Sequence, residues 1–294
     1  MADETVKGRV AIVTGAGKGL GKAYARWLAE RGCAVVVNNR IHPGVASTAR
    51  ALVEEITATG GKAVAHEGPV DDQASAQEMI QTALREFGRL DILICNAGVM
   101  PEGPFAEIGV DELERTVHTN IWGAVHPLQA AWKHMLGTGY GRIVVSGSAV
   151  GLYGHPSGVI YGTTRSAMVG LARGLALEAP KGSDIGVNVI NPLAYTPMSS
   201  TQMDRNRGAE ASAMNLPPEK VATVVGFLCS EACKLTGAIF HAGGGKVSRV
   251  AIIESQSIPV ESLSMETVAK LSFEGSLDHE PKQAIGVSAR MLGG

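Results

Sequence analysis

A tyrosine and an arginine stand four residues apart in the stretch Tyr161-Gly162-Thr163-Thr164-Arg165. Residues at i and i+4 share one face of a helix, so the phenol and the guanidinium would lie side by side. A phenol with an ordinary pKa of about 10 is a weak base at neutral pH, and a nearby cation favours its ionised form. The pair predicts either an acid/base catalyst or a surface pair without a chemical role, and the surrounding sequence must decide.

A glycine-rich stretch, TGAGKGLG at Thr14–Gly21, separates a strand-like run from a helical one. Glycines at such a turn let the backbone approach a pyrophosphate, while the free amides and the helix dipole stabilise the anion. A tight turn without a ligand is the alternative, but the strand-then-helix context favours binding. The stretch therefore predicts dinucleotide contacts from Gly15, Lys18, Gly19, Leu20 and Gly21.

The end of the second strand-like run, VNNR, should meet the adenosine ribose. An acid at this place would hydrogen-bond the ribose hydroxyls and repel a 2′-phosphate. Asn39 stands there instead, followed by Arg40, and Lys18 lies in the glycine loop. Because a phosphate dianion needs charge-assisted donors, these residues favour NADP(H) over NAD(H). That both cations are merely solvated surface charges remains open.

The elements that must position these residues alternate along the chain. Near-continuous apolar runs such as RVAIVTG, AVVVNN, LDILICNAG and RIVVSGS indicate parallel strands buried on both faces. Helical stretches separate them, including long ones at 111–135 and 161–177. We predict an α/β fold: a single-domain, Rossmann-type, doubly wound parallel sheet with helices on both faces over residues 1–245.

Residues 246–294 depart from this rhythm and form a C-terminal extension. KVSRVAIIES predicts an extra edge strand, and SMETVAKLSFE predicts a short helix with Ser264 as N-cap and Glu266 in its first turn. The last residues, EPKQAIGVSARMLGG, carry little pattern, and we expect them to be mobile. We expect the extension to pack on the domain or on a neighbouring subunit, with a substrate lid as the alternative.

Composition excludes several classes of function. The 294 residues carry a net charge of only −2, which argues against nucleic acid or an anionic membrane as partner. No apolar run is long enough to span a bilayer. The four cysteines show no disulfide or metal spacing, so we expect buried free thiols, no metal site and a reducing, cytoplasmic location.

The stretch from Lys7 to Gly244 resembles the short-chain dehydrogenases/reductases. The likeness rests on six motifs in order: TGAGKGLG, CNAG (Cys95–Gly98), Asn120 in HTNIWG, Ser148 in IVVSGS, YGTTR, and NPLAYT (Asn191–Thr196). Ser148 precedes Tyr161 by 13 residues, which is the spacing the family uses. Within the family, the chain is most similar to the (3R)-hydroxyacyl-CoA dehydrogenase unit of multifunctional enzyme type 2 and its bacterial relatives.

The resemblance implies hydride transfer between a nicotinamide and a secondary alcohol or ketone. Tyr161 would be the general acid/base, and Ser148 would orient the substrate oxygen. Asn120 would hold a water at a helix irregularity, and Arg165 would complete the catalytic set. The resemblance also implies cofactor contacts from Val70, Asn96, Ala97, Gly98, Tyr161, Arg165, Pro192 and Thr196.

Arg165 is the chief departure from the family, which has a lysine here. A guanidinium supplies the charge and can donate to a ribose hydroxyl, but it cannot release a proton. We therefore expect catalysis that is weakened or has a higher pH optimum. Three lesser departures are Pro69 for an aspartate that contacts adenine, Cys95 for an asparagine, and Leu193 for a glycine near the nicotinamide.

The substrate side carries less pattern. The segment 197–217 contains Met198, Met203 and Met214, which suit either an apolar lid or a plain loop. Tyr153 and His155 are candidates for the pocket rim. The sequence does not distinguish among acyl thioesters, steroids, cyclic alcohols and aromatic ketones as substrates. A non-redox protein that keeps the fold and the dinucleotide is the alternative function, and the family likeness favours a homodimer or homotetramer.

Overall fold

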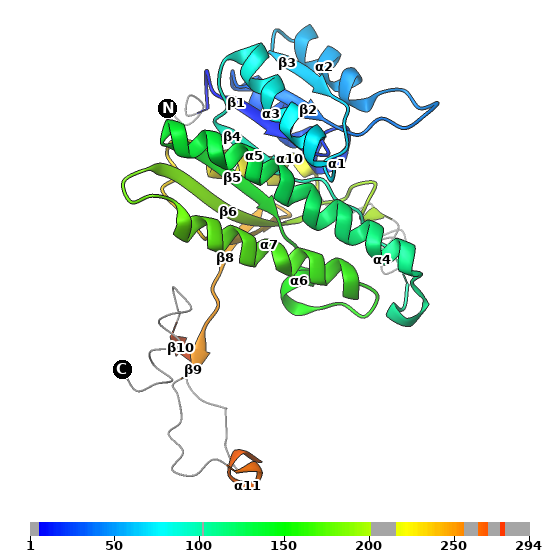
Figure 1. The fold of residues 1–294 in the computed structure, drawn as a ribbon, viewed down its shortest axis with the longest axis vertical. Helices are drawn as coiled ribbons and strands as arrows, with labels where there is room; N and C mark the ends of the chain where they lie inside the picture. The colour runs from blue at the N-terminus through cyan, green and yellow to red at the C-terminus, as the bar shows by residue number, and fades with distance from the viewer. Residues whose placement is uncertain (1–5, 102, 201–215, 256–263, 270–276, 280–294) are drawn as a thin grey trace. The chain divides into compact units, whose positions relative to one another are not determined.

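One mostly parallel sheet organises the chain (Figure 1), and its strand order is β3-β2-β1-β4-β5-β6-β7-β8. The computed structural model describes residues 6–101, 103–200, 216–255, 264–269 and 277–279. The strands are β1 Val10–Val13, β2 Ala34–Asn38, β3 Ala63–His66, β4 Ile92–Cys95, β5 Tyr140–Ser146, β6 Asp184–Leu193, β7 Ile239–Gly243 and β8 Lys246–Val250. Neighbours from β3 to β7 pair in parallel. The predicted doubly wound fold is confirmed.

Helices cover both faces of the sheet. The helices are α1 Gly19–Glu30, α2 Thr48–Ala58, α3 Gln73–Phe87, α4 Val110–Val117, α5 Gly123–Thr138, α6 Ala149–Tyr153, α7 Val159–Glu178 and α10 Pro218–Cys229. Apolar residues of α1, α2 and α10 share one core cluster with strand residues, while α3 packs on α5, and α7 packs on β5 and β6. In Figure 1, α5 and α7 run across the front of the sheet, and α1 and α10 lie behind it.

Strand β1 lies between β2 and β4 in the sheet. The chain adds β2 and β3 on one side of β1 and all later strands of the sheet on the other side, beginning with β4. In a doubly wound sheet, loops at the carboxyl ends of strands on either side of this switch point diverge and leave a crevice. The glycine loop after β1 and the CNAG stretch after β4 both begin at that edge. The fold thus brings together two motifs that are some 80 residues apart in the sequence, since Ala11 pairs with Ile92.

The long helical stretch expected at 111–135 has an irregular centre. A π-helical turn, His118–Trp122, joins α4 to α5, and Asn120 lies within it. A π-turn widens the helix locally and often marks a functional site. The structure therefore confirms a helix irregularity at Asn120.

Two glycines close the sheet at its last hairpin. Gly244 and Gly245 both have positive φ (58° and 76°), as a two-residue turn between antiparallel strands requires. The turn returns the chain into β8, so KVSRVAIIES begins as the predicted edge strand, covering Lys246–Val250. Two compact units result, Met1–Arg249 and Val250–Gly294.

The second unit contains few described elements: a β9–β10 pair (Glu254–Ser255 with Leu277–His279) and helix α11, Met265–Ala269. The Ser264 hydroxyl accepts a hydrogen bond from the Thr267 backbone N–H at 3.1 Å, so the predicted N-cap is confirmed. The residues expected to be mobile, 280–294, lie outside the described residues, as do residues 201–215 of the expected substrate loop.

The four cysteines are all buried and free, as predicted. Burial raises the pKa of the Cys95 thiol to about 12, so this thiol is not a nucleophile at neutral pH. Among the described helices, none combines the length and the apolar character needed to cross a bilayer.

Candidate active site

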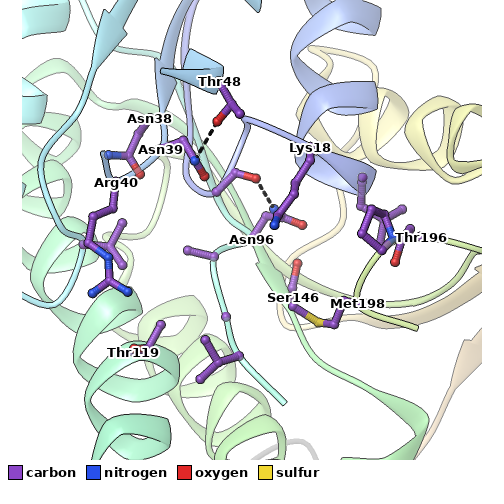
Figure 2. Close-up of a pocket in the computed structure, with 18 of the residues that line it drawn as sticks. Lys18, Asn38, Asn39, Arg40, Thr48, Asn96, Thr119, Ser146, Thr196 and Met198 are labelled. Carbon is purple, nitrogen blue, oxygen red and sulfur yellow. Dashed lines mark hydrogen bonds between the residues drawn. The ribbon is translucent and has the colours of Figure 1, made fainter. Parts of the chain in front are cut away.

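A cleft of about 330 Å³ opens at the carboxyl ends of the parallel strands (Figure 2), a volume typical of small-molecule sites. Most of the predicted cofactor residues line it: Gly15, Lys18, Gly19, Leu20, Asn39, Arg40, Val70, Asn96, Ala97, Gly98, Tyr161, Arg165, Pro192 and Thr196. Gly21, Asn120 and Ser148 are not part of its wall. The predicted site is thus one continuous cleft, with three residues set behind or beside it.

The glycine loop is tied to the CNAG stretch through Thr14. Its Oγ1 accepts hydrogen bonds from the backbone N–H groups of Asn96 (2.9 Å) and Ala97 (3.0 Å). In return, Asn96 Nδ2 donates to the carbonyl oxygens of Thr14 (3.0 Å) and Gly15 (3.3 Å). Gly15 has a φ of 63°, and a Cβ there would lie 2.9 Å from Ala97 Cα. Only glycine permits this approach of the two loops.

Helix α1 begins at the cleft with its first turn uncapped. The N-cap residue, Lys18, makes no side-chain capping hydrogen bond. The first amides of a helix lack partners within the helix, so they remain available to an anion. Gly21, in the first turn of α1, lies against the glycine loop, and a Cβ on it would be 2.4 Å from the Gly15 carbonyl oxygen. Gly21 therefore acts through close packing of helix and loop, not as part of the cleft wall.

Asn38 ends strand β2 and Asn39 follows it; both line the cleft, but their side chains have different hydrogen-bond partners. Asn38 is buried, and its Nδ2 lies 3.0 Å from His66 Nδ1 and donates to the Gly68 carbonyl at 2.9 Å. Asn39 faces the cleft, and its Nδ2 donates to Thr48 Oγ1 at 2.8 Å (Figure 2). Neither asparagine carries a charge, so the end of β2 itself presents no carboxylate to the cleft.

The charges at this end of the cleft are positive. Arg50 is held by Glu67, with Nε 3.0 Å from both carboxylate oxygens, and these hydrogen bonds lower the pKa of Glu67 to about 2. Lys18 and Arg40 line the cleft, and within the described part of the chain neither has an ion-pair partner. Two cations are therefore available to an anionic ligand.

Tyr161 and Arg165 lie on one face of α7, as the spacing predicts, and both line the cleft. Arg165 is only 3% exposed, so a solvated surface pair is excluded. Its Cζ lies 5.2 Å from the centre of the Tyr161 ring, a cation–π distance. Its Nη1 donates to the Ser146 carbonyl at 3.0 Å, and a Cβ on Gly98 would lie 1.9 Å from Nη2. Strand β5 and the CNAG stretch thus fix the guanidinium behind the phenol ring.

Asn120 is buried, and its amide is fully engaged by the protein. Nδ2 donates to the Val99 carbonyl (2.9 Å) and to Thr164 Oγ1 (3.0 Å), and Oδ1 accepts from the Val99 N–H (2.8 Å). The side chain therefore joins the loop after β4 to helix α7, the helix that carries Tyr161 and Arg165. The water expected at Asn120 remains a prediction.

Ser148 is the N-cap of the short helix α6. Its Oγ accepts a hydrogen bond from the Val150 N–H at 3.1 Å. A hydroxyl that accepts through a lone pair retains its own hydrogen for another acceptor. Ser148 can still donate to a substrate oxygen, although it does not line the cleft itself.

Sequence reasoning missed much of the cleft wall. The additional lining residues are Asn38, Ile41, His42, Val45, Ala46, Ser47, Thr48, Asp71, Val99, Thr119, Ser146, Gly147 and Pro197. Many belong to the β2–α2 loop, which has no periodicity. One signal was available: Ser47 before a helical run is an N-cap pattern, which places the start of α2 beside the end of β2.

The three lesser departures have mild structural effects. Pro69 lines the cleft where the family has an aspartate. Asp71, two residues later in the chain, also lines the cleft and supplies a carboxylate there. Cys95 Sγ packs 4.0 Å from the Ala124 carbonyl in the core. Leu193 continues strand β6 opposite Gly243, and no described non-glycine residue has a positive φ, so the leucine sits in an ordinary backbone conformation.

Comparison with known proteins identifies the family. The short chain dehydrogenase model matches residues 9–211, and the chain belongs to this family. A short-chain type dehydrogenase/reductase of Mycobacterium tuberculosis is 38% identical over 84% of this chain and 86% of its own length. Mouse peroxisomal multifunctional enzyme type 2 is 37% identical over 83% of this chain. The match spans 32% of the mouse protein, so the chain resembles one unit of that enzyme.

A solved structure agrees with this assignment. The crystal structure of a short chain dehydrogenase from Mycobacterium avium superposes with a TM-score of 0.79 and 31% identity, covering 91% of this chain and 95% of that one. The likeness therefore covers the domain as a whole and confirms both the fold and the family predicted from the six motifs.

Proposed function

We propose that this chain transfers a hydride between NADP(H) and the carbinol or carbonyl carbon of a small secondary alcohol or ketone. Its membership of the short chain dehydrogenase family supports oxidoreductase chemistry. The observation that carries the proposal is that Tyr161 and Arg165 line the same cleft as the glycine loop. An acid/base group and a dinucleotide site thus share one space.

The chain's own residues supply the proton chemistry. Tyr161 donates its hydroxyl proton to the carbonyl oxygen during reduction and accepts the alcohol proton during oxidation. Ser148 keeps a hydrogen free for the same oxygen because its lone pair already accepts from Val150. Arg165 supplies a buried positive charge behind the phenol ring. Asn120, tied to Val99 and Thr164, holds the helix that carries Tyr161 in register with the cleft.

The residues of the cleft fit NADP(H), which when bound supplies or accepts the hydride. The lack of a Cβ on Gly15 and the uncapped start of α1 suit a pyrophosphate. Lys18 and Arg40, without ion-pair partners in the described residues, suit a 2′-phosphate. Asn39 is neutral, whereas an aspartate or glutamate at this position would repel that phosphate. Cofactor preference thus follows from the charges at the adenosine end.

Assembly into a homodimer or homotetramer is part of the proposal. Several large apolar side chains on the helices are exposed, including Val110 on α4, Leu136 on α5, and Val159 and Leu177 on α7. Covering such side chains in an interface releases water from apolar surface. Light scattering on a sizing column would give the mass directly, and a monomer at micromolar concentration would contradict this part.

The experiment follows the loss of NADPH, and separately of NADH, with a panel of ketones and 3-oxoacyl thioesters. Wild type is compared with Tyr161→Phe and with Tyr140→Phe, a matched control. Tyr140 lies at the amino end of β5, and its buried hydroxyl has no hydrogen-bond partner in the described structure. The proposal expects Tyr161→Phe alone to lose turnover. Tight cofactor binding without turnover on any substrate would favour the non-redox alternative.

A further inference from the structure

Thr48, the first residue of α2, lies at the same end of the cleft as Lys18, Asn39 and Arg40 (Figure 2). The cleft there is formed by three segments: the glycine loop, the end of β2 and the start of α2. Lys18 and Arg40 carry charge but are long and exposed. Thr48 is exposed as well, but it is short, so a single side-chain rotation sets the position of its hydroxyl.

Packing against the glycine loop fixes that position. A Cβ on Gly17 would lie 2.1 Å from Thr48 Oγ1 and 2.8 Å from Asn39 Cγ. The hydroxyl and the amide therefore occupy the space that any larger residue at Gly17 would need. Thr48 is thus held against the loop that would carry the cofactor phosphates.

The hydrogen bonds of Thr48 leave its proton free. Its Oγ1 accepts from Asn39 Nδ2 at 2.8 Å, and no acceptor for its own hydrogen is found among the described residues. A threonine inside a helix usually donates to a carbonyl one turn earlier, as Thr57 does to Val53 at 2.8 Å on this same helix. Thr48 stands at the first helical position, so no carbonyl of its helix precedes it by a turn.

Among the described residues, no carboxylate accepts a hydrogen bond from Thr48. Glu67 is held by Arg50, whose Nε lies 3.0 Å from both of its oxygens. Asp71, the carboxylate that lines the cleft, comes from the segment after β3. A donor without an acceptor of its own, in the same cleft wall as Lys18 and Arg40, suits an anionic oxygen, and the dinucleotide offers one in a phosphate.

We propose that Thr48 donates a hydrogen bond to the 2′-phosphate of NADP(H) and is, with Lys18 and Arg40, a determinant of cofactor selectivity. This inference rests on the proposed function and names a further residue of the same site. The Asn39–Thr48 hydrogen bond gives Asn39 a second role, because it occupies a lone pair of the Thr48 oxygen and leaves the hydroxyl hydrogen to another acceptor.

The test measures dissociation constants of NADPH and NADH by quenching of protein fluorescence. Thr48→Val keeps the shape and removes the hydroxyl, Thr48→Ser keeps the hydroxyl, and Thr48→Ala is a second deletion in case valine disturbs the helix start. Loss of a hydrogen bond to a charged group should weaken NADPH binding about 10- to 100-fold. NADH binding should stay within about threefold, and Thr48→Ser should keep the wild-type preference.

Each other outcome overturns the inference in a recognisable way. Unchanged NADPH binding in both deletions would show that Thr48 does not contact the 2′-phosphate, while the proposed function would stand. Equal weakening of NADPH and NADH would make Thr48 a structural residue of the β2–α2 loop. A wild type with no preference for NADPH would remove the proposed cofactor, and this inference with it.

Discussion

Replacing Arg165 with lysine separates the two things that this side chain does. The arginine is 3% exposed, donates from Nη1 to the Ser146 carbonyl at 3.0 Å, and lies with Cζ 5.2 Å from the Tyr161 ring centre. Lysine keeps the positive charge but removes the planar fork that reaches both Ser146 and Gly98. Stability and turnover should therefore move in opposite directions.

The stability cost comes from the hydrogen bond to strand β5. A hydrogen bond from a charged donor to a buried carbonyl contributes about 1.5–3 kcal/mol, and its loss leaves the Ser146 carbonyl without that donor. For a chain of this size, about 2 kcal/mol corresponds to a fall in Tm of roughly 4–8 °C. Differential scanning calorimetry of the two proteins measures this directly.

Turnover should rise because an ammonium can release a proton to a neighbouring group and a guanidinium cannot. We expect Arg165→Lys to be faster by roughly tenfold, a small part of the 10²–10⁴-fold range of acid/base catalysis. Arg165→Met, which removes the charge, is the control and should lose turnover while also losing the bond to Ser146. Unchanged kinetics in Arg165→Lys, or full turnover in Arg165→Met, would refute the assignment of the cation to the catalytic step.

Three more outcomes follow from the same contacts. Gly98→Ala places a Cβ 1.9 Å from Arg165 Nη2, so it should lower Tm and turnover, and the loss should shrink in an Arg165→Lys background in a double-mutant cycle. Asn39→Asp should weaken NADPH binding at least about tenfold and strengthen NADH binding, because a carboxylate repels the 2′-phosphate and accepts from the ribose; equal effects on both would contradict the assignment. Burial lowers the pKa of His66 below 6.5, so the unfolded chain takes up the proton first, and urea titrations should show stability falling as pH drops below about 6.5, less so in His66→Gln.

Much of the fold and part of the site could be predicted because their signals are local. The runs VAIV at Val10–Val13 and ILIC at Ile92–Cys95 are apolar throughout because both faces of a parallel sheet are covered. The glycine loop is recognisable because tight turns and close approach both require glycine. Tyr161 and Arg165 could be paired because a helix has a fixed period.

The rest depends on tertiary structure that has no local signal. Thr48 reaches the cleft only because the loop after β2 returns to the glycine loop, where Gly17 makes room for it. Ser148 stands at the family spacing from Tyr161, yet its Oγ caps α6 and lies outside the cleft wall. The anchoring of Arg165 to Ser146 joins residues on a helix and a strand, and no periodicity predicts that contact.

The central claim is that a hydride passes between the nicotinamide and a substrate carbon in this cleft. The most direct measurement uses NADPH carrying deuterium at both C4 positions of the nicotinamide and, by mass spectrometry, looks for the label in the alcohol formed from a ketone or 3-oxoacyl thioester. The account predicts one deuterium per product molecule, bound to the carbinol carbon, with wild type and none with Tyr161→Phe. Tight binding of labelled NADPH with no label transferred to any substrate, or label transfer that persists in Tyr161→Phe, would contradict it.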